Sequence, residues 1–165
     1  MTEVNTKTVF ITGASSGIGY ATARLFQDKG WNVVATLRKP EQAEALAALP
    51  RVLCLPLDVN DRASIHAAVE KAIAHFGAID VLVNNAGWDV IKPFLDTDPD
   101  LWKKVIDINL YGPLNMHHAV LPGMVKNGGG RVVNIASDAG RVGSSGEAVY
   151  SACKGGIISF TKTVA

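Results

Sequence analysis

The chain has 165 residues, of which 48% are hydrophobic and 19% charged, and its formal net charge is +1. This length predicts one domain with a sizeable core, and the near-neutral charge excludes the cationic surface of proteins that bind nucleic acid or anionic membranes. No apolar run approaches the roughly 18 residues of a membrane span, and residues 1–7 hold no apolar signal core. We therefore expect a cytoplasmic protein with no nucleic-acid or membrane partner.

Strand and helix signals alternate along the chain, with no internal repeat and no low-complexity linker. Short apolar runs predict strands at residues 9–12, 33–37, 52–55, 81–83 and 131–136. Helical spacing of apolar side chains, with Gly30 and Gly77 as stops and Asp98 as an N-cap, predicts helices at residues 17–29, 40–46, 62–76, 99–126 and 148–165. The long helix is expected to break near Gly112–Pro113, and residues 137–147 are predicted as a loop.

Strands that are apolar throughout, without alternating polar residues, and that are separated by helices indicate a parallel sheet covered by helices on both faces. With right-handed crossovers, this pattern predicts a Rossmann-type doubly wound α/β fold in one domain over residues 1–165. Ligands of such folds bind at the carboxyl ends of the strands. Polar or glycine-rich turns follow four predicted strands, at residues 12–19, 37–39, 84–87 and from 137 onward. We expect these turns to converge on one cleft.

The cysteines and histidines indicate no disulfide framework and no metal site. Cys54 and Cys153 are too few for such a framework and fit a reducing compartment, where each is expected to be a small buried side chain. The histidines lack metal-ligand spacing with acidic or cysteine partners. They are His66, His75, His117 and His118. For the last two, packing on a helix face or subunit contact is favoured over catalysis.

The turn after the first strand reads Thr12-Gly13-Ala14-Ser15-Ser16-Gly17-Ile18-Gly19. Glycines let backbone N–H groups approach a phosphate closely, and the start of the following helix favours negative charge. The turn therefore predicts a site for a dinucleotide pyrophosphate, formed by Gly13, Ser15, Ser16, Gly17, Ile18 and Gly19. The spacing is G-x-x-x-G-x-G rather than G-x-G-x-x-G, so an ordinary tight turn is the alternative when this stretch is taken alone.

Tyr150 and Lys154 lie four residues apart and share a face of the last predicted helix. A tyrosine pKa near 10 is too high for a general base at neutral pH, but a nearby lysine ammonium favours the phenolate and lowers the pKa. The pair then suits acid–base catalysis, and Ser137, at the end of the fifth strand, could donate a hydrogen bond to a substrate oxygen. Taken alone, a surface tyrosine and lysine one turn apart are the simpler alternative.

The second predicted strand ends at Leu37, where an NAD-specific site needs a carboxylate for the adenosine ribose. Leu37 cannot accept a hydrogen bond, and Arg38 and Lys39 follow it. A guanidinium there can bind a 2′-phosphate through paired hydrogen bonds and stack on adenine, and Ser15 could add a donor. These residues predict a preference for NADP(H), with NAD(H) as the alternative. Arg38 as a merely solvated cation is the alternative reading of that residue.

Together with Asn84-Asn85-Ala86-Gly87, Asn109 and Ser137, the glycine-rich turn and the Tyr150–Lys154 pair resemble the motifs of the short-chain dehydrogenase/reductase family, in order and spacing, over essentially the whole chain. The resemblance implies an NAD(P)-dependent oxidoreductase that interconverts a secondary alcohol and a ketone by hydride transfer. It implies that Tyr150 donates or accepts the proton, that Lys154 holds the ribose hydroxyls and depresses the pKa of Tyr150, and that Ser137 polarises the substrate oxygen. Asn109 is implied to order a water molecule that links Lys154 to solvent.

The same resemblance implies further contacts to the cofactor. Asp58 and Val59 would contact the adenine. The residues expected to line the adenosine side and pack the strand are Asn85, Ala86 and Gly87. Two of these positions have structural alternatives, with Asp58 as the cap of a turn and Asn84 as a brace of the sheet.

The second half of the chain resembles the 2-hydroxycyclohexanecarboxyl-CoA dehydrogenases more closely, in residues 85–89, 116–125 and 134–150. Those enzymes use NAD and oxidise a β-hydroxyacyl thioester to the β-ketoacyl thioester, which implies an acyl-CoA substrate. Residues 137–147 would form a wall of the substrate cleft. A 3-oxoacyl-carrier-protein reductase or a hydroxysteroid dehydrogenase-like reductase is the alternative among enzymes. A non-catalytic dinucleotide sensor or an inactive fragment is the alternative from another class.

Members of the family continue beyond the helix that carries Lys154, so we expect the chain to be a truncated form of the usual domain. In the family, the long helix and the helix after Tyr150 pair with their counterparts in a neighbouring subunit, which implies a homodimer or homotetramer for the complete protein. The side chains expected to make these apolar contacts are Val120, Met124, Ile157 and Ile158. For the chain alone, an uncovered sheet edge leads us to expect poor solubility or marginal stability.

Overall fold

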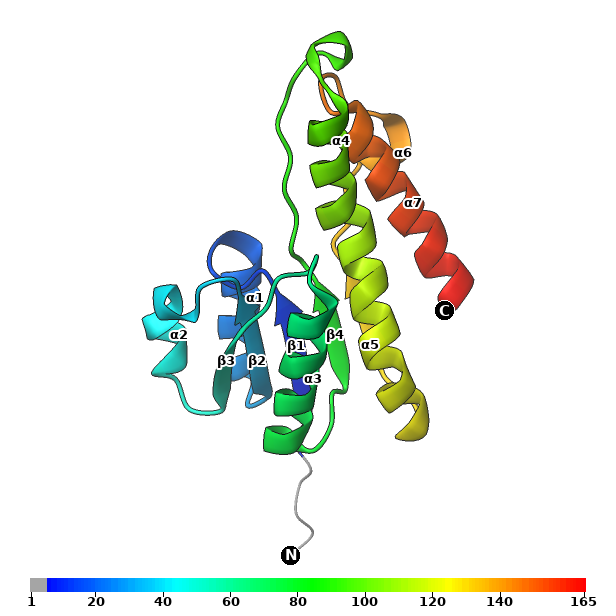
Figure 1. Cartoon of the computed structure of the whole chain (residues 1–165). Coiled ribbons are helices and arrows are strands. Elements are labelled where there is room, and N and C mark those ends of the chain that lie inside the picture. The colour runs from blue at the N-terminus through cyan, green and yellow to red at the C-terminus, as the bar shows by residue number, and fades with distance from the viewer. Residues whose placement is uncertain (1–5) are drawn as a thin grey trace, which may run out of the picture.

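The computed structural model describes residues 6–165 and contains a parallel sheet of five strands. The strands are β1 (Thr8–Thr12), β2 (Asn32–Leu37), β3 (Val52–Pro56), β4 (Val81–Asn84) and β5 (Arg131–Asn134). Their order is β3-β2-β1-β4-β5, so the chain moves outward from β1 to β3 and then crosses back to β4 (Figure 1). This reversal places the carboxyl ends of β1 and β4 side by side, at the point where doubly wound folds bind ligands.

Helices fill the connections between the strands. The α-helices are α1 (Gly17–Asp28), α2 (Glu44–Ala47), α3 (Arg62–Phe76), α4 (Pro99–Ile106), α5 (Gly112–Lys126), α6 (Ala139–Val142) and α7 (Ala148–Val164). Two short 3₁₀ turns described in residues 6–165 are η1 (Pro40–Ala43) and η2 (Phe94–Asp96). The π-helical segment η3 (Asp107–Tyr111) joins α4 to α5.

Alternate residues of β1 point to opposite faces of the sheet, and helices cover each face. Phe10 lies in an apolar cluster with Leu82 of β4 and with side chains of α3 and α5. Val9 and Ile11 lie in a second cluster with side chains of α1 and of the η1–α2 segment. Every residue of β1 is at most 1% exposed. The predicted Rossmann-type doubly wound fold, with helices on both faces, is confirmed.

The long helix predicted over residues 99–126 is continuous, and the break expected near residues 112–113 is wrong. The Asp98 side chain caps its start by accepting a hydrogen bond from a backbone N–H of the first turn at 2.8 Å. Instead of breaking, the helix widens into η3, where the Gly112 N–H donates to the Asp107 carbonyl five residues earlier. Pro113 has no N–H with which to continue the ordinary ladder, and the wider turn accommodates it without ending the helix.

The segment between β5 and α7 is not the uniform loop that the sequence predicts. The strand ends at Asn134, two residues before its predicted end, and Ala139–Val142 form the single turn α6. Ser137 starts this turn, because its Oγ accepts a hydrogen bond from the Ala139 backbone N–H at 3.2 Å. Four residues are too few to show helical periodicity. For the same reason η2 was not predicted, and residues 40–46 form η1 followed by α2 rather than one helix.

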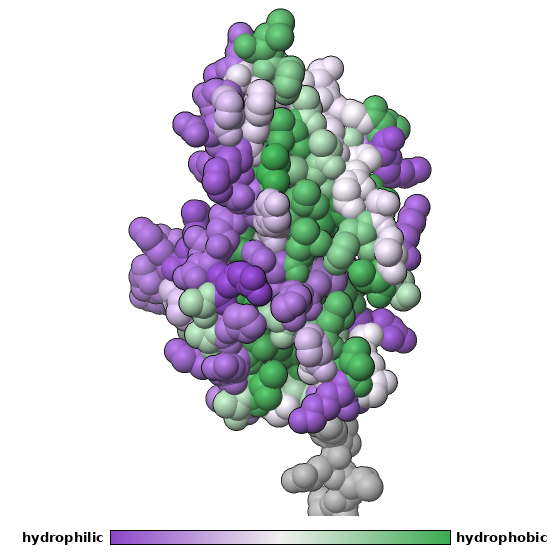
Figure 2. All heavy atoms as spheres, turned by 45° about the vertical axis from the view of Figure 1, so that its right-hand side comes forward, coloured by the Kyte–Doolittle hydropathy of each residue, from purple (hydrophilic) through white to green (hydrophobic). Residues whose placement is uncertain are grey.

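Apolar side chains gather on the side of the molecule where α4, α5 and α7 lie (Figure 2). Three of the residues expected to contact a neighbouring subunit do not belong to this surface. Val120 and Met124 are each 3% exposed and Ile157 is 1% exposed, because they pack inside the chain. Their assignment to subunit contacts is therefore wrong, since an apolar helix position in sequence does not distinguish core from interface. Ile158 is half-buried, and the dimer or tetramer stays a prediction.

In the part of the chain that the structure describes, residues 6–165, no helix is long and apolar enough to cross a membrane. No group of three or more His, Cys, Asp or Glu side chains in that range is arranged to hold a metal ion. Both cysteines are free thiols; Cys153 is buried as expected, whereas Cys54 is only half-buried.

Candidate active site

Tight backbone contacts hold the glycine-rich turn after β1 against the end of β4. A Cβ atom on Gly13 would lie 2.9 Å from the Ala86 Cα atom, and one on Gly19 would lie 2.3 Å from the Gly13 carbonyl oxygen. The Asn85 Nδ2 atom donates hydrogen bonds to the Thr12 and Gly13 carbonyl oxygens, each at 3.0 Å. Gly13 and Gly19 are therefore required by packing, and Asn85 fixes the path of the turn.

The outer part of the same turn is open. Ser15, Ser16, Gly17 and Ile18 are exposed, and a Cβ atom on Gly17 would meet nothing within 4 Å. Ser16 is the N-cap of α1, but its side chain makes no capping hydrogen bond. The first N–H groups of a helix have no partner within it, and here the N-cap side chain does not satisfy them. This open cradle fits a phosphate group of a dinucleotide, as the sequence predicts.

A cavity of about 440 Å³ adjoins this cradle. It brings together most of the residues predicted to bind a cofactor, namely Gly13, Ser15, Ser16, Arg38, Asp58, Val59, Asn85, Ala86 and Gly87. Gly17, Ile18 and Gly19 are not among its lining residues. Sequence reasoning missed Leu57, Asn60, Trp88, Lys104 and Ile108, which also line it. Adjacency to Gly87 could have identified Trp88, and helical spacing on the segment that carries Asn109 could have identified Lys104 and Ile108.

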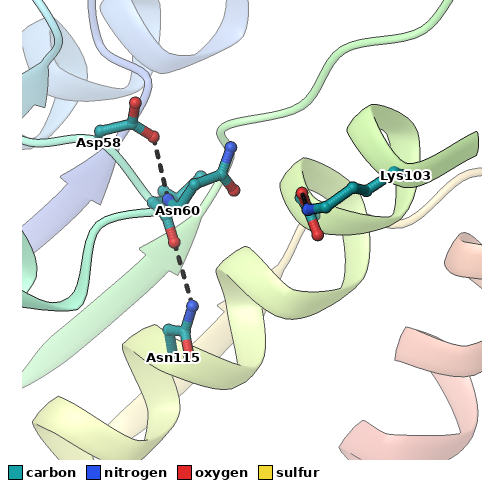
Figure 3. A network of polar contacts seen from close by, with 6 residues as sticks. Asp58, Asn60, Lys103 and Asn115 are labelled. Carbon is teal, nitrogen blue, oxygen red and sulfur yellow. Dashed lines mark hydrogen bonds and ion pairs between the residues drawn. The ribbon is translucent and has the colours of Figure 1, made fainter. Parts of the chain in front are cut away.

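The wall of the cavity after β3 is held by side-chain hydrogen bonds. The Asp58 Oδ1 atom accepts from the Asn60 N–H at 2.9 Å, and the Ser64 Oγ atom accepts from the Asp58 N–H at 3.0 Å. From the long helix, the Asn115 Nδ2 atom donates to the Val59 carbonyl oxygen at 3.2 Å (Figure 3). Asp58 thus caps a turn, as its structural alternative predicts, and this turn holds Asp58 and Val59 at the cavity.

The end of β2 carries the charges expected beside a 2′-phosphate. Leu37 is only 3% exposed, whereas Arg38 and Lys39 are exposed. A second cavity of about 390 Å³ is lined by Ser15, Leu37, Arg38, Lys39 and Gln42. Ser15, Leu37 and Arg38 line the larger cavity as well. Two cations and a hydroxyl therefore surround a space that adjoins the larger cavity.

Tyr150, Lys154 and Ser137 meet where α7 passes the end of β5. The Lys154 Nζ atom lies 5.4 Å from the centre of the Tyr150 ring, and the Ser137 hydroxyl is near enough to the Tyr150 side chain to act on its pKa. Close packing fixes the turn that carries Ser137 to α7, because a Cβ atom on Gly140 would lie 2.6 Å from the Gly155 nitrogen. The structure thus brings these three predicted catalytic residues together.

The pKa of Tyr150 is raised above its ordinary value, whereas the sequence predicts a lowered one. Burial is the main cause, the carboxylates of Glu147 and Asp89 add to it, and the hydrogen-bonding group of Ser137 opposes it. The expected effect of Lys154 on this pKa is absent from these causes. The prediction of a lowered pKa is therefore wrong for this structure, because spacing on a helix does not reveal where the lysine ammonium forms its hydrogen bond.

Lys154 is 4% exposed, and its Nζ atom donates to the Ile135 carbonyl oxygen at 2.7 Å. Burial lowers the pKa of this lysine. A Cβ atom on Gly87 would lie 3.9 Å from the Lys154 Nζ atom and 3.1 Å from the Asn109 Oδ1 atom. Gly87, which lines the large cavity, therefore connects that cavity to two of the predicted catalytic residues, Asn109 and Lys154.

Asn109 is completely buried in η3. Its Oδ1 atom accepts a hydrogen bond from the Trp88 N–H at 3.3 Å, and its Nδ2 atom donates to the carbonyl oxygens of Trp88 at 2.6 Å and Val105 at 2.9 Å. The side chain thus joins the segment after β4 to the long helix. The water molecule that the family resemblance places between Asn109, Lys154 and solvent stays a prediction.

Asn84 braces the sheet, as its structural alternative predicts. Its Nδ2 atom donates to the Asn134 Oδ1 atom at 2.8 Å, and the Asn134 Nδ2 atom donates to the Thr161 Oγ1 atom at 2.9 Å. These bonds join β4, β5 and α7. His117, which is 2% exposed, packs beside them, so packing within the chain accounts for this histidine.

Comparison with known proteins decides the family of this chain. The profile of the short chain dehydrogenase family matches residues 7–165. The chain belongs to this family. Among relatives of this short-chain dehydrogenase, the 3-oxoacyl-[acyl-carrier-protein] reductase FabG of Thermotoga maritima is 40% identical over 162 residues, covering 95% of this chain and 66% of the relative. The sulfoacetaldehyde reductase 2 of Chromohalobacter salexigens is 39% identical over 159 residues, covering 93% of this chain and 63% of the relative.

A solved structure shows the same likeness in three dimensions. The crystal structure of a short-chain dehydrogenase from Streptomyces avermitilis matches with a TM-score of 0.92 and 34% identity, covering 97% of this chain and 60% of that one. The family resemblance and the Rossmann-type fold expected from the motifs are thereby confirmed. This short-chain dehydrogenase chain spans about two thirds of the length of the curated relatives it matches.

Proposed function

We propose that this short-chain dehydrogenase is an NADP(H)-dependent oxidoreductase that interconverts a secondary alcohol and a ketone. One observation carries the proposal: the glycine-rich cradle and the catalytic group meet at a single residue. Gly87 lines the cavity that adjoins the cradle, and a Cβ atom on Gly87 would lie 3.9 Å from the Lys154 Nζ atom. A dinucleotide whose phosphates occupied the cradle would therefore extend toward Tyr150.

When bound, the nicotinamide ring supplies or accepts the hydride. During ketone reduction, the Tyr150 hydroxyl donates its proton to the substrate oxygen, and during alcohol oxidation the phenolate accepts it. A raised pKa keeps this hydroxyl protonated at neutral pH, which suits a proton donor. Ser137, which acts on the pKa of Tyr150 from close by, orients the same substrate oxygen. Lys154, buried beside Gly87, holds the ribose hydroxyls.

The preference for NADP(H) is supported by the end of β2. Leu37 is buried and offers no carboxylate to a ribose, while Arg38 and Lys39 are exposed around the smaller cavity. A planar guanidinium binds phosphate through paired hydrogen bonds. Ser15, at the junction of the two cavities, adds a hydroxyl.

We propose a β-ketoacyl thioester as the substrate class. The Thermotoga maritima relative is named a 3-oxoacyl-[acyl-carrier-protein] reductase, and a relative from Streptomyces virginiae, 41% identical over 176 residues, is named a putative ketoacyl reductase. Both names describe reduction of a ketone on an acyl chain, and the first places that ketone at the β position of a carrier-bound acyl group. The CoA thioester expected from the sequence stays a prediction, and a carrier-protein thioester is its alternative.

Replacing Tyr150 by Phe tests the proposal, with acetoacetyl-CoA as the probe and dinucleotide absorbance as the measurement. Tyr150→Phe should bind NADPH as the wild type does but lose turnover by roughly 10² to 10⁴-fold, because it lacks the proton donor. Tyr111→Phe, at a tyrosine that is 55% exposed, is the matched control and should keep full turnover. A Tyr150→Phe variant with more than about a tenth of wild-type turnover would contradict the assignment.

A further inference from the structure

Lys104 lies over the face of Trp88, and both side chains line the large cavity. The Lys104 Nζ atom is 3.7 Å from the centre of the Trp88 ring, well inside the range of about 6 Å in which a cation is attracted to an aromatic face. Ser15 and Ser16 of the glycine-rich cradle line the same cavity. A positive charge is thus held on a wall formed by α4 and by the segment after β4, separate from the cradle.

The backbone of Trp88, whose ring lies against the Lys104 ammonium, is held in place by hydrogen bonds. The completely buried Asn109 side chain accepts from the Trp88 N–H at 3.3 Å and donates to the Trp88 carbonyl oxygen at 2.6 Å. Both polar groups of the Trp88 backbone are therefore held by one side chain of the long helix. A cation placed before a ligand arrives loses less conformational entropy on binding than a freely moving lysine does.

The preceding residue on the same helix provides a contrast. Lys103 forms an ion pair with Asp107, one turn later on the helix, so its charge is balanced within the chain. Throughout residues 6–165, no carboxylate forms an ion pair with Lys104. Its charge is thus free to bind an anion in the cavity.

The cavity has two cationic side chains at different places. Arg38 follows β2 and also lines the smaller cavity, whereas Lys104 lies against Trp88, which directly follows Gly87. Gly87 lies close to Lys154, so Lys104 belongs to the catalytic side of the cavity and Arg38 to the opposite side. The carboxylate in the lining, Asp58, already accepts a hydrogen bond from the Asn60 backbone.

We propose that Lys104, held on the face of Trp88, contacts the diphosphate bridge of the bound dinucleotide from the side opposite the glycine-rich cradle. The inference rests on the proposed dinucleotide binding and adds a residue to it. The cradle supplies neutral N–H donors, and Lys104 supplies the charge. Because NADH and NADPH share the diphosphate, Lys104 acts on both cofactors, whereas Arg38 acts only on the 2′-phosphate of NADPH.

Binding of NADPH and of NADH is measured by calorimetry on wild type, Lys104→Met, Lys104→Arg and Lys103→Met, at low and high salt. Lys104→Met should weaken both dinucleotides about tenfold, because a charge-assisted contact to phosphate is lost, and its affinity should depend less on salt than that of the wild type. Lys104→Arg should bind nearly as the wild type does. Lys103→Met, the matched control, should change neither affinity by more than about twofold.

The outcomes separate this inference from the proposed function. A wild-type chain that binds neither dinucleotide overturns both. Wild-type binding with Lys104→Met indistinguishable from Lys103→Met overturns the role of Lys104 alone. Loss of NADPH affinity alone in Lys104→Met also overturns it, because the contact would then be to the 2′-phosphate. Thermal unfolding of each variant verifies the fold, and an exposed lysine should leave the midpoint unchanged.

Discussion

Gly140 of α6 and Gly155 of α7 touch backbone to backbone. A Cβ atom on Gly140 would lie 2.6 Å from the Gly155 nitrogen, and one on Gly155 would lie 3.0 Å from the Gly140 carbonyl oxygen. This contact fixes the turn that begins at Ser137 to the helix that carries Tyr150. The position of the Ser137 side chain relative to that of Tyr150 therefore depends on two glycines.

Replacing Gly140 by Ala should destabilise the protein, because backbone atoms rather than a flexible side chain would have to move. We expect the free energy of unfolding to fall by about 1–3 kcal/mol in urea titrations. Gly156→Ala on the same helix is the control, since its Cβ atom would lie an ordinary 3.5 Å from a Leu110 methyl group. That variant should be neutral or slightly more stable. Equal stability of the two variants would show that the contact is not tight.

Arg38→Leu should separate the two cofactors. The loss of a charged partner for the 2′-phosphate should weaken NADPH binding by about tenfold or more, while NADH binding hardly changes. The two affinities, measured on the same variant, serve as each other's control. Equal weakening of both, or a wild type that binds NADH more tightly, would contradict the predicted preference for NADP(H).

Asp89→Asn should lower the pKa of Tyr150. The Asp89 carboxylate disfavours the negatively charged phenolate and so raises that pKa, and its removal should shift the titration to lower pH. Ultraviolet difference spectra of the phenolate, with Tyr150→Phe as the reference, follow this titration directly. Because the protonated hydroxyl is the proposed proton donor, the pH above which ketone reduction declines should fall by the same amount. An unchanged titration in Asp89→Asn would contradict the assignment of part of the raised pKa to this carboxylate.

The stability of the protein should fall as the pH decreases through the range of histidine titration. His117 is buried edge-on against Phe160, and burial lowers its pKa, although the hydrogen bond to the Pro113 carbonyl opposes this. The unfolded chain, with a histidine pKa of about 6.5, then binds a proton more readily than the folded chain does. The stabilisation is complete above that pH and is lost as the pH falls from it toward the lower pKa of the folded state.

Thermal midpoints measured between about pH 8 and pH 5 test the role of this histidine. His117→Gln should show a flatter pH dependence than the wild type, whatever its absolute stability. His118→Gln is the matched control, because the neighbouring His118 is exposed and should leave the slope as it is. Identical slopes in His117→Gln and the wild type would assign the acid sensitivity to other groups.

The parts of the site that could be predicted from sequence are those set by local backbone chemistry. The glycine-rich turn predicts both a close backbone contact and an open helix start. The structure shows the close contact at Gly13 and the open helix start at Gly17. The burial of Leu37 and the exposure of Arg38 at the end of β2 were predictable for the same reason, because one side chain is apolar and the next is charged. The alternation of strands and helices sufficed for the doubly wound fold.

The parts that could not be predicted depend on contacts between distant segments. Tyr150 and Lys154 share a helix face, but the Lys154 ammonium donates a hydrogen bond to the Ile135 carbonyl oxygen just after β5, so local spacing gave the wrong direction for the pKa of Tyr150. Val120 and Met124 are equally apolar whether they face a core or a subunit. Lys104 reveals its role only once α4 is placed beside Trp88.

The π-helical segment η3 holds one residue more per turn than the helices on either side of it. Each residue of an α-helix advances about 100° around the axis, so this extra residue offsets the faces of α4 and α5 by that angle. With this offset, Lys104 lines the cavity, and Met116, farther along the same continuous helix, packs in the core with side chains of α3. Deleting one residue from 107–111 would leave a regular helix, but it would rotate one of these two faces out of place.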